Sequence, residues 1–354
     1  MAVVSVTDNF DALFTTTLRN SSKVIGDTIS TSNLAFYRIK EAGGFEEVDS
    51  LGYQAVQPLM YDLGAAQPFA GYDVLSTTPT EGLTAALFEW RNLAVPVTIS
   101  GDEEAKNSGE NALLGLLKAK IEHANLGIRE AFNKYFLQGN GPNSATAVHT
   151  PYTNTATGAQ FIDPLPLLVK YDPTTSTSIG SINQATHTWW RNQKNSADPT
   201  TYAGLLKELR KLFNDCSKGP GGEPDIHIAG QGAFEVYVAA LAASHQNASY
   251  TKADIPFTSV QFMGHPLVFD QYVIDAANGT AAGVPVAAAD SWYMLTSKFI
   301  KLKVHSKTNF ATTDFRRPVD QDARTAQIMW RGAVTLSNRR KHGVMGLIDS
   351  GIAS

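Results

Sequence analysis

The chain has 354 residues, of which 43% are hydrophobic and 18% are charged, and its formal net charge is -4. This length suggests two cores, or one core with large extensions, and the low share of charged residues indicates that part of the surface is buried against another molecule. The acidic balance argues against a protein whose main work is to grip nucleic acid, because neutralising phosphates requires an excess of basic residues.

The N-terminal region predicts an arm followed by a hairpin. The first 50 residues alternate short apolar clusters with Ser, Thr and Asn, and they contain no stretch long enough for a core of their own. Strand-like patches follow at Phe45–Tyr61 and Leu83–Ile99, separated by a segment rich in Gly, Pro, Ala and Thr. Because a hairpin of two strands is marginally stable alone, we expect it to lie on a neighbour.

A long helix is predicted from Asp102 to Gln138. Ser100 and Glu103 form the Ser-x-x-Glu pattern of a capping box, and the acidic residues 102–104 suit the positive N-terminal end of a helix. Apolar residues recur along this run at spacings of three, four and seven: Leu113, Leu117, Ile121, Ala124, Ile128, Phe132 and Phe136. A helix of about 35 residues would be about 50 Å long, which predicts an elongated body.

The rest of the chain predicts shorter elements. A strand is expected over 164–171, helices over 202–216 and 232–243, and strands over 225–229, 260–269 and 292–304. The single cysteine, Cys216, lies in the first of these helices, and we interpret it as a small buried hydrophobic residue rather than a nucleophile. A glycine-rich break at residue 219 opens a second lobe that reaches about residue 307, and residues 323–348 are interpreted as a return to the first lobe.

The sequence lacks the patterns of catalytic, metal-binding and targeting segments. It has no Gly-x-Ser-x-Gly turn, and its eight histidines show no metal-ligand spacing. No apolar run approaches the roughly 20 residues of a membrane span, and no signal peptide is recognisable. We therefore expect no enzyme, no cofactor, no metal site and no membrane partner. A hydrolase whose Asp and His residues come together only on folding is the least favoured of the hypotheses considered below.

Two clusters of aromatic and basic residues are candidates for contacts between subunits. Trp189, Trp190 and Arg191 lie in a polar loop, where an interface anchor competes with a buried position in the core. Near the C-terminus, a strand pattern leads into a short basic turn, where a solvated turn competes with a contact to a neighbour's acidic groups or to DNA. The candidate contact residues there are Trp330, Arg331, Arg339, Arg340 and His342.

Several segments together resemble one family. The run VPVTISGDEEAKNSGENALLGLLKAKIEHANLGIREAFNKYFLQGNG resembles the strand and long spine helix of the major capsid proteins of tailed bacteriophages. Four later segments resemble the same proteins in the same order: GSINQATHTWWRNQ, IAGQGAFEVYVAAL, VQFMGHPLVFD and MWRGAVTLSNRRKHGVM. The resemblance covers about residues 45–348.

This resemblance implies an α+β chain with the HK97 capsid fold. Its parts would be an N-terminal arm at 1–45, an E-loop hairpin at 46–101, a peripheral domain with the spine helix at 102–218 and 308–354, and an axial domain at 219–307. In this family the E-loop lies over an adjacent subunit, and the axial domains surround the fivefold and sixfold axes.

The resemblance also implies a function. We expect a major capsid protein that self-assembles into hexamers and pentamers and forms the icosahedral head of a virion around double-stranded DNA, after synthesis in the host bacterial cytoplasm. Expected partners are further copies of the chain, a portal at one vertex, packaged DNA on the inner face and a decoration protein. A separate scaffolding protein is expected because nothing before Phe45 resembles the long helical extension of HK97. An encapsulin-like nanocompartment shell is the alternative.

Overall fold

The computed structural model describes residues 39–49, 52–62, 68–71, 73, 81–106, 110–139, 151–243, 260–273, 289–349 and 352. The predicted arm up to residue 38, and most of the predicted hairpin tip, lie outside these ranges.

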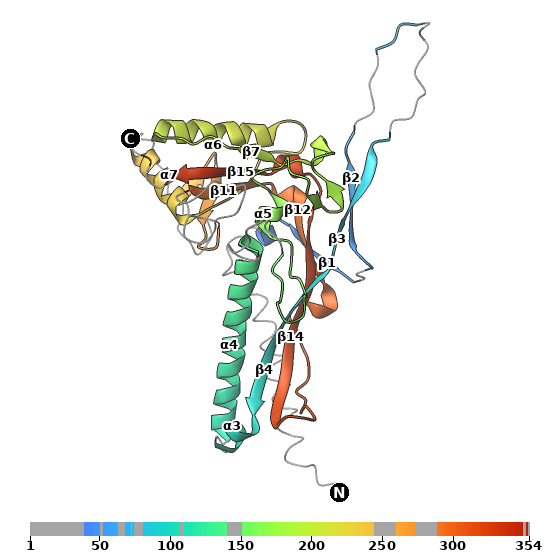
Figure 1. Ribbon diagram of the computed structural model, residues 1–354, viewed down its shortest axis with the longest axis vertical. Helices are drawn as coiled ribbons and strands as arrows, with labels where there is room; N and C mark the ends of the chain where they lie inside the picture. The colour runs from blue at the N-terminus through green and yellow to red at the C-terminus, as the bar shows by residue number, and fades with distance from the viewer. Residues whose placement is uncertain are drawn as a thin grey trace.

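One lobe is elongated and consists of a long helix packed on a five-stranded sheet (Figure 1). Strand β4 (Arg91–Ser100) leads into helices α3 (Gly101–Lys106) and α4 (Glu110–Leu137), and it pairs antiparallel over its whole length with β14 (Ala323–Leu336). The remaining strands of this sheet are β1 (Phe45–Val48), β12 (Ile300–His305) and β13 (Ala311–Thr312).

The predicted capping box is confirmed at the start of α3. The Glu103 N–H donates to Ser100 Oγ, and the Ser100 N–H donates to Glu103 Oε2, both at 3.2 Å. Lys120 Nζ on α4 donates to Glu103 Oε1 at 3.0 Å. The hydrogen bond from Lys120, followed by that from Ser100, lowers the pKa of Glu103. The cap thus also ties the first helical turn to the long helix.

One face of α4 packs on the sheet. The predicted apolar side chains that the structure describes are all buried: Leu117, Ile121, Ala124, Ile128, Phe132 and Phe136. They share one core with Val97 and Ile99 of β4 and with Ile328 and Trp330 of β14. Burial of this stripe against the sheet, rather than helix propensity alone, stabilises so long a helix.

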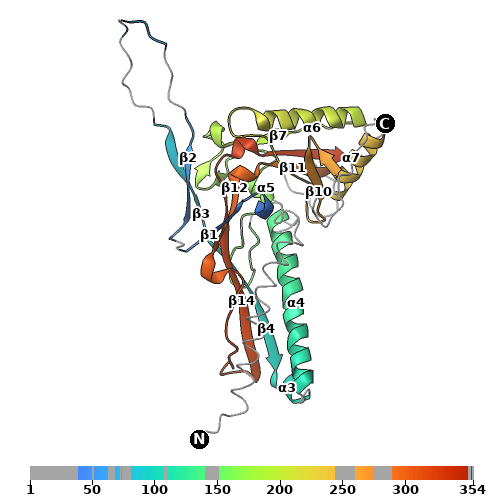
Figure 2. The ribbon, with the colours of Figure 1, turned by 180° about the vertical axis from the view of Figure 1, so that it is seen from behind.

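A second lobe contains a six-stranded sheet of order β7-β15-β11-β8-β10-β9 with two helices packed against it (Figure 2). Its elements are β7 (Gln193–Asn195), α6 (Tyr202–Ser217), β8 (Ile226–Ala229), α7 (Gln231–Ala243), β9 (Val260–Phe262), β10 (His265–Phe269), β11 (Ala289–Leu295) and β15 (Gly343–Asp349). Both predicted helices are confirmed here. Cys216 is fully buried in α6, and burial raises the pKa of its thiol to about 12, which makes it unreactive.

Three predicted strands differ from the structure. Residues 164–171 form no strand but contain the helical turn α5 (Leu165–Leu168), because the amide-lacking Pro164 and Pro166 favour a helix start. Residues 260–269 form a hairpin, since Met263 and Gly264 have φ values of 51° and 87° and reverse the chain. Residues 292–304 are divided between β11 and β12, which join different sheets through the turn η2 (Ser297–Phe299).

The two sheets also differ from the predicted domain boundaries. β7 and α6 precede residue 219 but belong to the second lobe, whereas β12 precedes residue 308 but belongs to the elongated lobe. β15 does not return to the first lobe; it lies between β7 and β11. The apolar pattern of a strand identifies its buried face but not the strands that will pair with it, so sequence order was a poor guide to lobe membership.

Polar contacts join α4 to the second lobe. The Asn133 side-chain amide donates to both carboxylate oxygens of Asp270, at 2.8 and 3.1 Å, and the Tyr272 hydroxyl donates to Glu130 Oε1 at 2.8 Å. Asp270 directly follows β10, and burial raises the pKa of its carboxyl. These contacts hold the helix and the second lobe at a defined angle.

Candidate interaction surfaces

The inner part of the predicted hairpin is a separate two-stranded ribbon. Strands β2 (Ala55–Met60) and β3 (Leu83–Phe88) pair antiparallel, and the ribbon projects from the region where the lobes meet (Figures 1 and 2). The hairpin prediction is confirmed for these strands. The outer parts of the predicted hairpin, β1 and β4, instead belong to the five-stranded sheet.

One face of this ribbon is anchored to the body of the same chain. Ala55, Leu59, Ala86 and Phe88 are buried. The Leu87 N–H donates to the carbonyl oxygen of Gly180 at 3.0 Å. This glycine has a φ of +60°, and a Cβ there would lie 2.8 Å from Ala86 Cβ, so the close approach requires glycine.

The opposite face of the ribbon is apolar at every position, and all of its residues except the half-buried Leu87 are exposed. Its six residues are Val56, Pro58, Met60, Leu83, Ala85 and Leu87. Val56 is 53%, Met60 70% and Leu83 77% exposed. Tyr53 and Phe69, which flank the two-stranded region, are 95% and 68% exposed. Contiguous apolar surface of this kind marks an interaction site in a folded protein. We call the six residues the apolar ribbon face.

The predicted Trp–Arg loop packs against the outer end of the ribbon, next to the Met60–Leu83 pair. Trp189 is half-buried, and its ring stacks on Tyr61 with centroids 4.9 Å apart. Arg191 donates to the carbonyl oxygens of Gln184 and Ala185, at 2.8 and 2.7 Å. Trp190 is buried, and its Nε1 donates to the Ile179 carbonyl oxygen at 2.9 Å.

The predicted basic turn points partly inward. The fully buried guanidinium of Arg339 donates four hydrogen bonds, to Leu168 O, Gln184 Oε1, Trp190 O and Asn192 Oδ1, at 2.8 to 3.1 Å. Burial lowers its pKa to about 9, so the guanidinium stays charged at neutral pH. It is a clamp that holds three loop segments together.

Burial corrects the predicted contact role of four residues. Trp190, Trp330, Arg339 and His342 are at most 1% exposed in the single subunit, so their side chains cannot touch another subunit. Arg331 and Arg340 are exposed, and Trp189 and Arg191 are half-buried. For these four, a role in contacts between subunits remains a prediction.

Two histidines of the second lobe are buried, and neither forms a salt bridge with another described residue. His227 lies among the rings of Phe213, Phe262 and Trp292. Burial lowers the pKa of both His227 and His342 to about 3. Within the described residues, no three His, Cys, Asp or Glu side chains are grouped to hold a metal ion. No described helix is long and apolar enough to cross a membrane.

Comparisons of the whole chain identify its fold. No protein-family model matches the sequence, and no curated protein sequence matches it. The structure is similar to the cyanophage A-1(L) capsid asymmetric unit, with a TM-score of 0.57, 13% identity, and coverage of 87% of this chain and 92% of that one. It is similar to the SrpI encapsulin of Synechococcus elongatus PCC 7942, with a TM-score of 0.52, 8% identity, and coverage of 86% and 85%.

A further similar structure is the capsid of Myoviridae phage XM1, with a TM-score of 0.52, 10% identity, and coverage of 88% of this chain and 91% of that one. These matches extend over nearly the full length of both chains. The α+β chain therefore has the HK97 fold, as its sequence predicted.

Proposed function

We propose that the chain is a major capsid protein that self-assembles into hexamers and pentamers and forms an icosahedral head around double-stranded DNA. The observation that carries this proposal is the apolar ribbon face, which one subunit leaves open to solvent. The similarity to the cyanophage and XM1 capsids supports the proposal at the level of the fold.

The proposed mechanism is geometric. The ribbon of each subunit lies over the next subunit, so that one head-to-tail contact, repeated by rotation, closes a ring. The elongated lobe takes the place of the peripheral domain and the second lobe that of the axial domain. The inter-lobe contact between Asn133 and Asp270 fixes the angle on which ring closure depends.

The proposed partners follow from this role. They are other copies of the chain, a separate scaffolding protein, a portal at one vertex, a decoration protein and packaged DNA on the inner face. The protein works in the virion capsid after assembly in the host cytoplasm, and it carries out no catalysis.

An encapsulin-like nanocompartment shell is the second candidate, supported by the similarity to the SrpI encapsulin over 86% of the chain. The contents of the particle separate the two functions. DNA-filled particles formed together with portal and terminase proteins would support the capsid. Particles that take up a cargo protein through a short peptide tag would support the nanocompartment.

A triple variant tests the role of the ribbon face. In Val56→Ser, Met60→Ser and Leu83→Ser, three exposed apolar residues become polar while the buried face of the ribbon is unchanged. We expect wild-type protein to form closed shells in electron micrographs and the variant to remain as subunits or small oligomers, with an unchanged far-UV circular dichroism spectrum and melting temperature.

The control is Leu126→Ser, which changes an apolar residue that is 54% exposed on α4 and far from the ribbon in sequence. It should assemble like the wild type. Normal shells from the triple variant would refute the role of the ribbon face. Wild-type protein that stays monomeric even when it is produced together with the scaffolding protein would refute the proposed function.

A further inference from the structure

The ribbon is attached to the body of its own chain at two points along its length. Near the inner end, the Leu87 N–H donates to the carbonyl oxygen of Gly180 at 3.0 Å. At the outer end, the ring of Tyr61 stacks on that of Trp189, with the two planes at 20°. Leu87 pairs with Val56, which precedes Tyr61 by five residues, so about 17 Å of strand separates the attachments. One attachment would fix only the position of the ribbon, whereas two at this separation also fix its direction.

The inner attachment depends on a tight turn. Strands β5 (Ser178–Ile179) and β6 (Ile182–Asn183) form a hairpin whose two turn residues, Gly180 and Ser181, have φ values of 60° and 64°. Positive φ at both positions is typical of a type I′ turn, which joins two strands with a two-residue loop. The turn presents the Gly180 carbonyl oxygen to β3, next to the buried ring of Phe88. This contact fixes the inner end of the ribbon in place.

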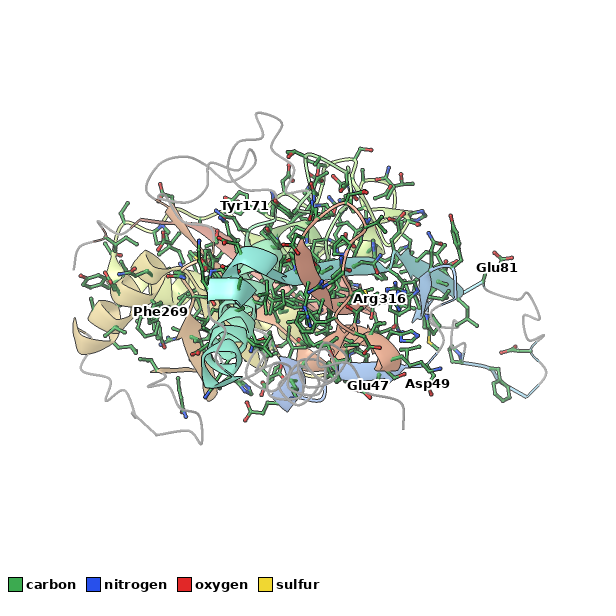
Figure 3. All side chains as sticks on the ribbon, turned by 90° about the horizontal axis from the view of Figure 1, so that it is seen from below. Glu47, Asp49, Glu81, Tyr171, Phe269 and Arg316 are labelled. Atoms are coloured by element: carbon green, nitrogen blue, oxygen red, sulfur yellow. The ribbon has the colours of Figure 1, made fainter. Side chains whose placement is uncertain are left out.

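The outer attachment depends on one aromatic side chain of the ribbon. Tyr61 directly follows β2, and its N–H donates to the carbonyl oxygen of Gly82 at 2.9 Å, which continues the strand pairing by one step. By the alternation of a strand, its side chain lies on the body-facing side with Ala55 and Leu59. Figure 3 shows Glu81, the residue before Gly82, far from the mass of the molecule. The stack is therefore located where the ribbon leaves the body.

Trp189 is held in place by its neighbours in the Trp–Arg loop. It lies in the helical turn η1 (Thr188–Trp190), and its ring meets that of the buried Trp190 with centroids 5.8 Å apart. Trp190 in turn donates from Nε1 to the carbonyl oxygen of Ile179 on β5. The guanidinium of Arg339 lies 5.8 Å from the centre of the Trp190 ring and donates to the Trp190 carbonyl oxygen at 2.8 Å. The same loop thus supports both attachments of the ribbon.

Arg339, which supports this loop, lies on the connection between the two lobes. It begins the turn η4 (Arg339–Lys341), which joins β14 of the five-stranded sheet to β15 of the six-stranded sheet. The connection, the Trp–Arg loop and the ribbon are therefore linked by one continuous set of contacts. The direction of the ribbon is defined relative to both lobes rather than to one of them.

We propose that Trp189 is a positioning residue that holds the ribbon of each subunit in one direction through its stack on Tyr61. Loss of either ring leaves the inner attachment as a pivot, about which the outer end of the ribbon swings. The consequence for assembly rests on the proposed function. One contact repeated by rotation builds the shell, so the angle at which that contact is offered sets the curvature. Ribbons with one direction then give shells of one diameter, and ribbons with a spread of directions give shells of mixed diameter.

A distance measurement on unassembled subunits of the full chain tests the direction of the ribbon. Spin labels are attached to Glu81→Cys at the outer end of the ribbon and to Lys207→Cys on α6, both at exposed positions. Cys216 is buried and stays unlabelled. Double electron–electron resonance should give one narrow distance peak for this pair. Trp189→Ala and Tyr61→Ala should each broaden the peak at least about twofold, because the lost aromatic pair no longer holds the outer end.

Three controls separate positioning from a general effect on folding. Trp189→Ala combined with Tyr61→Ala should give the same width as either single variant, because both rings act through one contact. Trp189→Phe keeps an aromatic ring and should restore the narrow peak. Labels at Glu122→Cys on α4 and Lys207→Cys on α6 leave out the ribbon, and their peak should keep its width in every variant. A narrow peak in both single variants, or equal broadening of the α4–α6 pair, would overturn the role of Trp189.

Electron micrographs of assembled particles test the consequence. We expect one diameter for shells of the wild type and of Trp189→Phe, and a spread of diameters at least about twofold wider for Trp189→Ala. Shells of one diameter from Trp189→Ala, together with a broad distance peak in its subunits, would overturn the link between ribbon direction and shell size. Failure of the wild type to form shells would instead overturn the proposed function, whereas the distance measurement on subunits would still decide the role of Trp189.

Discussion

The rings of Phe132 on α4 and Trp330 on β14 meet edge to face, at 90° and with centroids 4.8 Å apart. Trp330 is 1% exposed, so it joins the long helix to the central strand of its sheet. Replacing Trp330 with Ala should lower the free energy of unfolding by about 3–5 kcal/mol through loss of buried area and creation of a cavity. Urea denaturation of the unassembled subunit measures this change. A variant of wild-type stability that fails only in assembly would contradict the core role of Trp330.

The buried hydrogen bonds of Arg339 should contribute as much to the free energy of unfolding as the packing of Trp330. Arg339→Met removes the donor from four buried acceptors, and we expect a loss of about 3–5 kcal/mol in the free energy of unfolding. Its neighbour Arg340 is exposed, so Arg340→Met should change stability by less than about 0.5 kcal/mol. Equal melting temperatures for the two variants would show that the hydrogen bonds of Arg339 are not stabilising.

The buried histidines predict a loss of stability in acid. His227 has a pKa of about 3 in the folded chain and about 6.5 when unfolded, so below pH 6.5 the unfolded state takes up the proton and the folded state does not. The free energy of unfolding should fall by about 1.4 kcal/mol per pH unit for this group as pH decreases from 6.5. His342 acts in the same direction.

His227→Leu isolates this contribution. The variant should show a shallower decline in stability between pH 6.5 and 5 in urea titrations, whereas His123→Leu, at an exposed position on α4, should follow the wild type. Asp163 acts in the opposite direction, because burial raises the pKa of its carboxyl to about 6. That effect is common to all three proteins. Parallel pH profiles for His227→Leu and wild type would rule out the histidine.

Two glycines should respond to alanine in opposite ways. Gly127 lies within α4 with nothing within 4 Å of an added Cβ, so Gly127→Ala should stabilise the subunit by about 0.5–1 kcal/mol. At Gly332, an added Cβ would lie 2.5 Å from the Trp330 ring and 2.7 Å from the Lys303 carbonyl oxygen. Gly332→Ala should therefore destabilise by about 1–3 kcal/mol. Thermal melting of both variants under the same conditions compares them directly.

Local signals in the sequence predicted the local structure well. The capping box at Ser100 and Glu103, the buried face of α4 and the helix that contains Cys216 each depend on residues within a few positions of one another. Pairing between distant strands could not be predicted in this way. Strand β15 pairs with β7 and β11 in the six-stranded sheet. The apolar pattern of β15 would suit the five-stranded sheet equally well, so its partners could not be read from its own residues.

The interaction residues were predicted less well because residue type does not reveal burial. Arg339 and Arg340 are identical neighbours in sequence, yet one guanidinium is enclosed by carbonyl groups from loops 147 to 171 residues away and the other faces solvent. The apolar ribbon face was missed at the level of residues, although alternation of the strand pattern would have identified Val56, Pro58 and Met60 as one side. Which of the two faces of the strand is buried depends on the rest of the folded chain, so the strand pattern alone does not show that this apolar face is exposed.

The exposed ribbon makes the unassembled subunit prone to aggregation. It is a two-stranded sheet whose outer edges have no partner strand in the described part of the chain, and one side of it is entirely apolar. Such a surface promotes uncontrolled association of newly made subunits. Burial of this face against a second subunit would remove that liability, so the solubility of the subunit depends on its assembly.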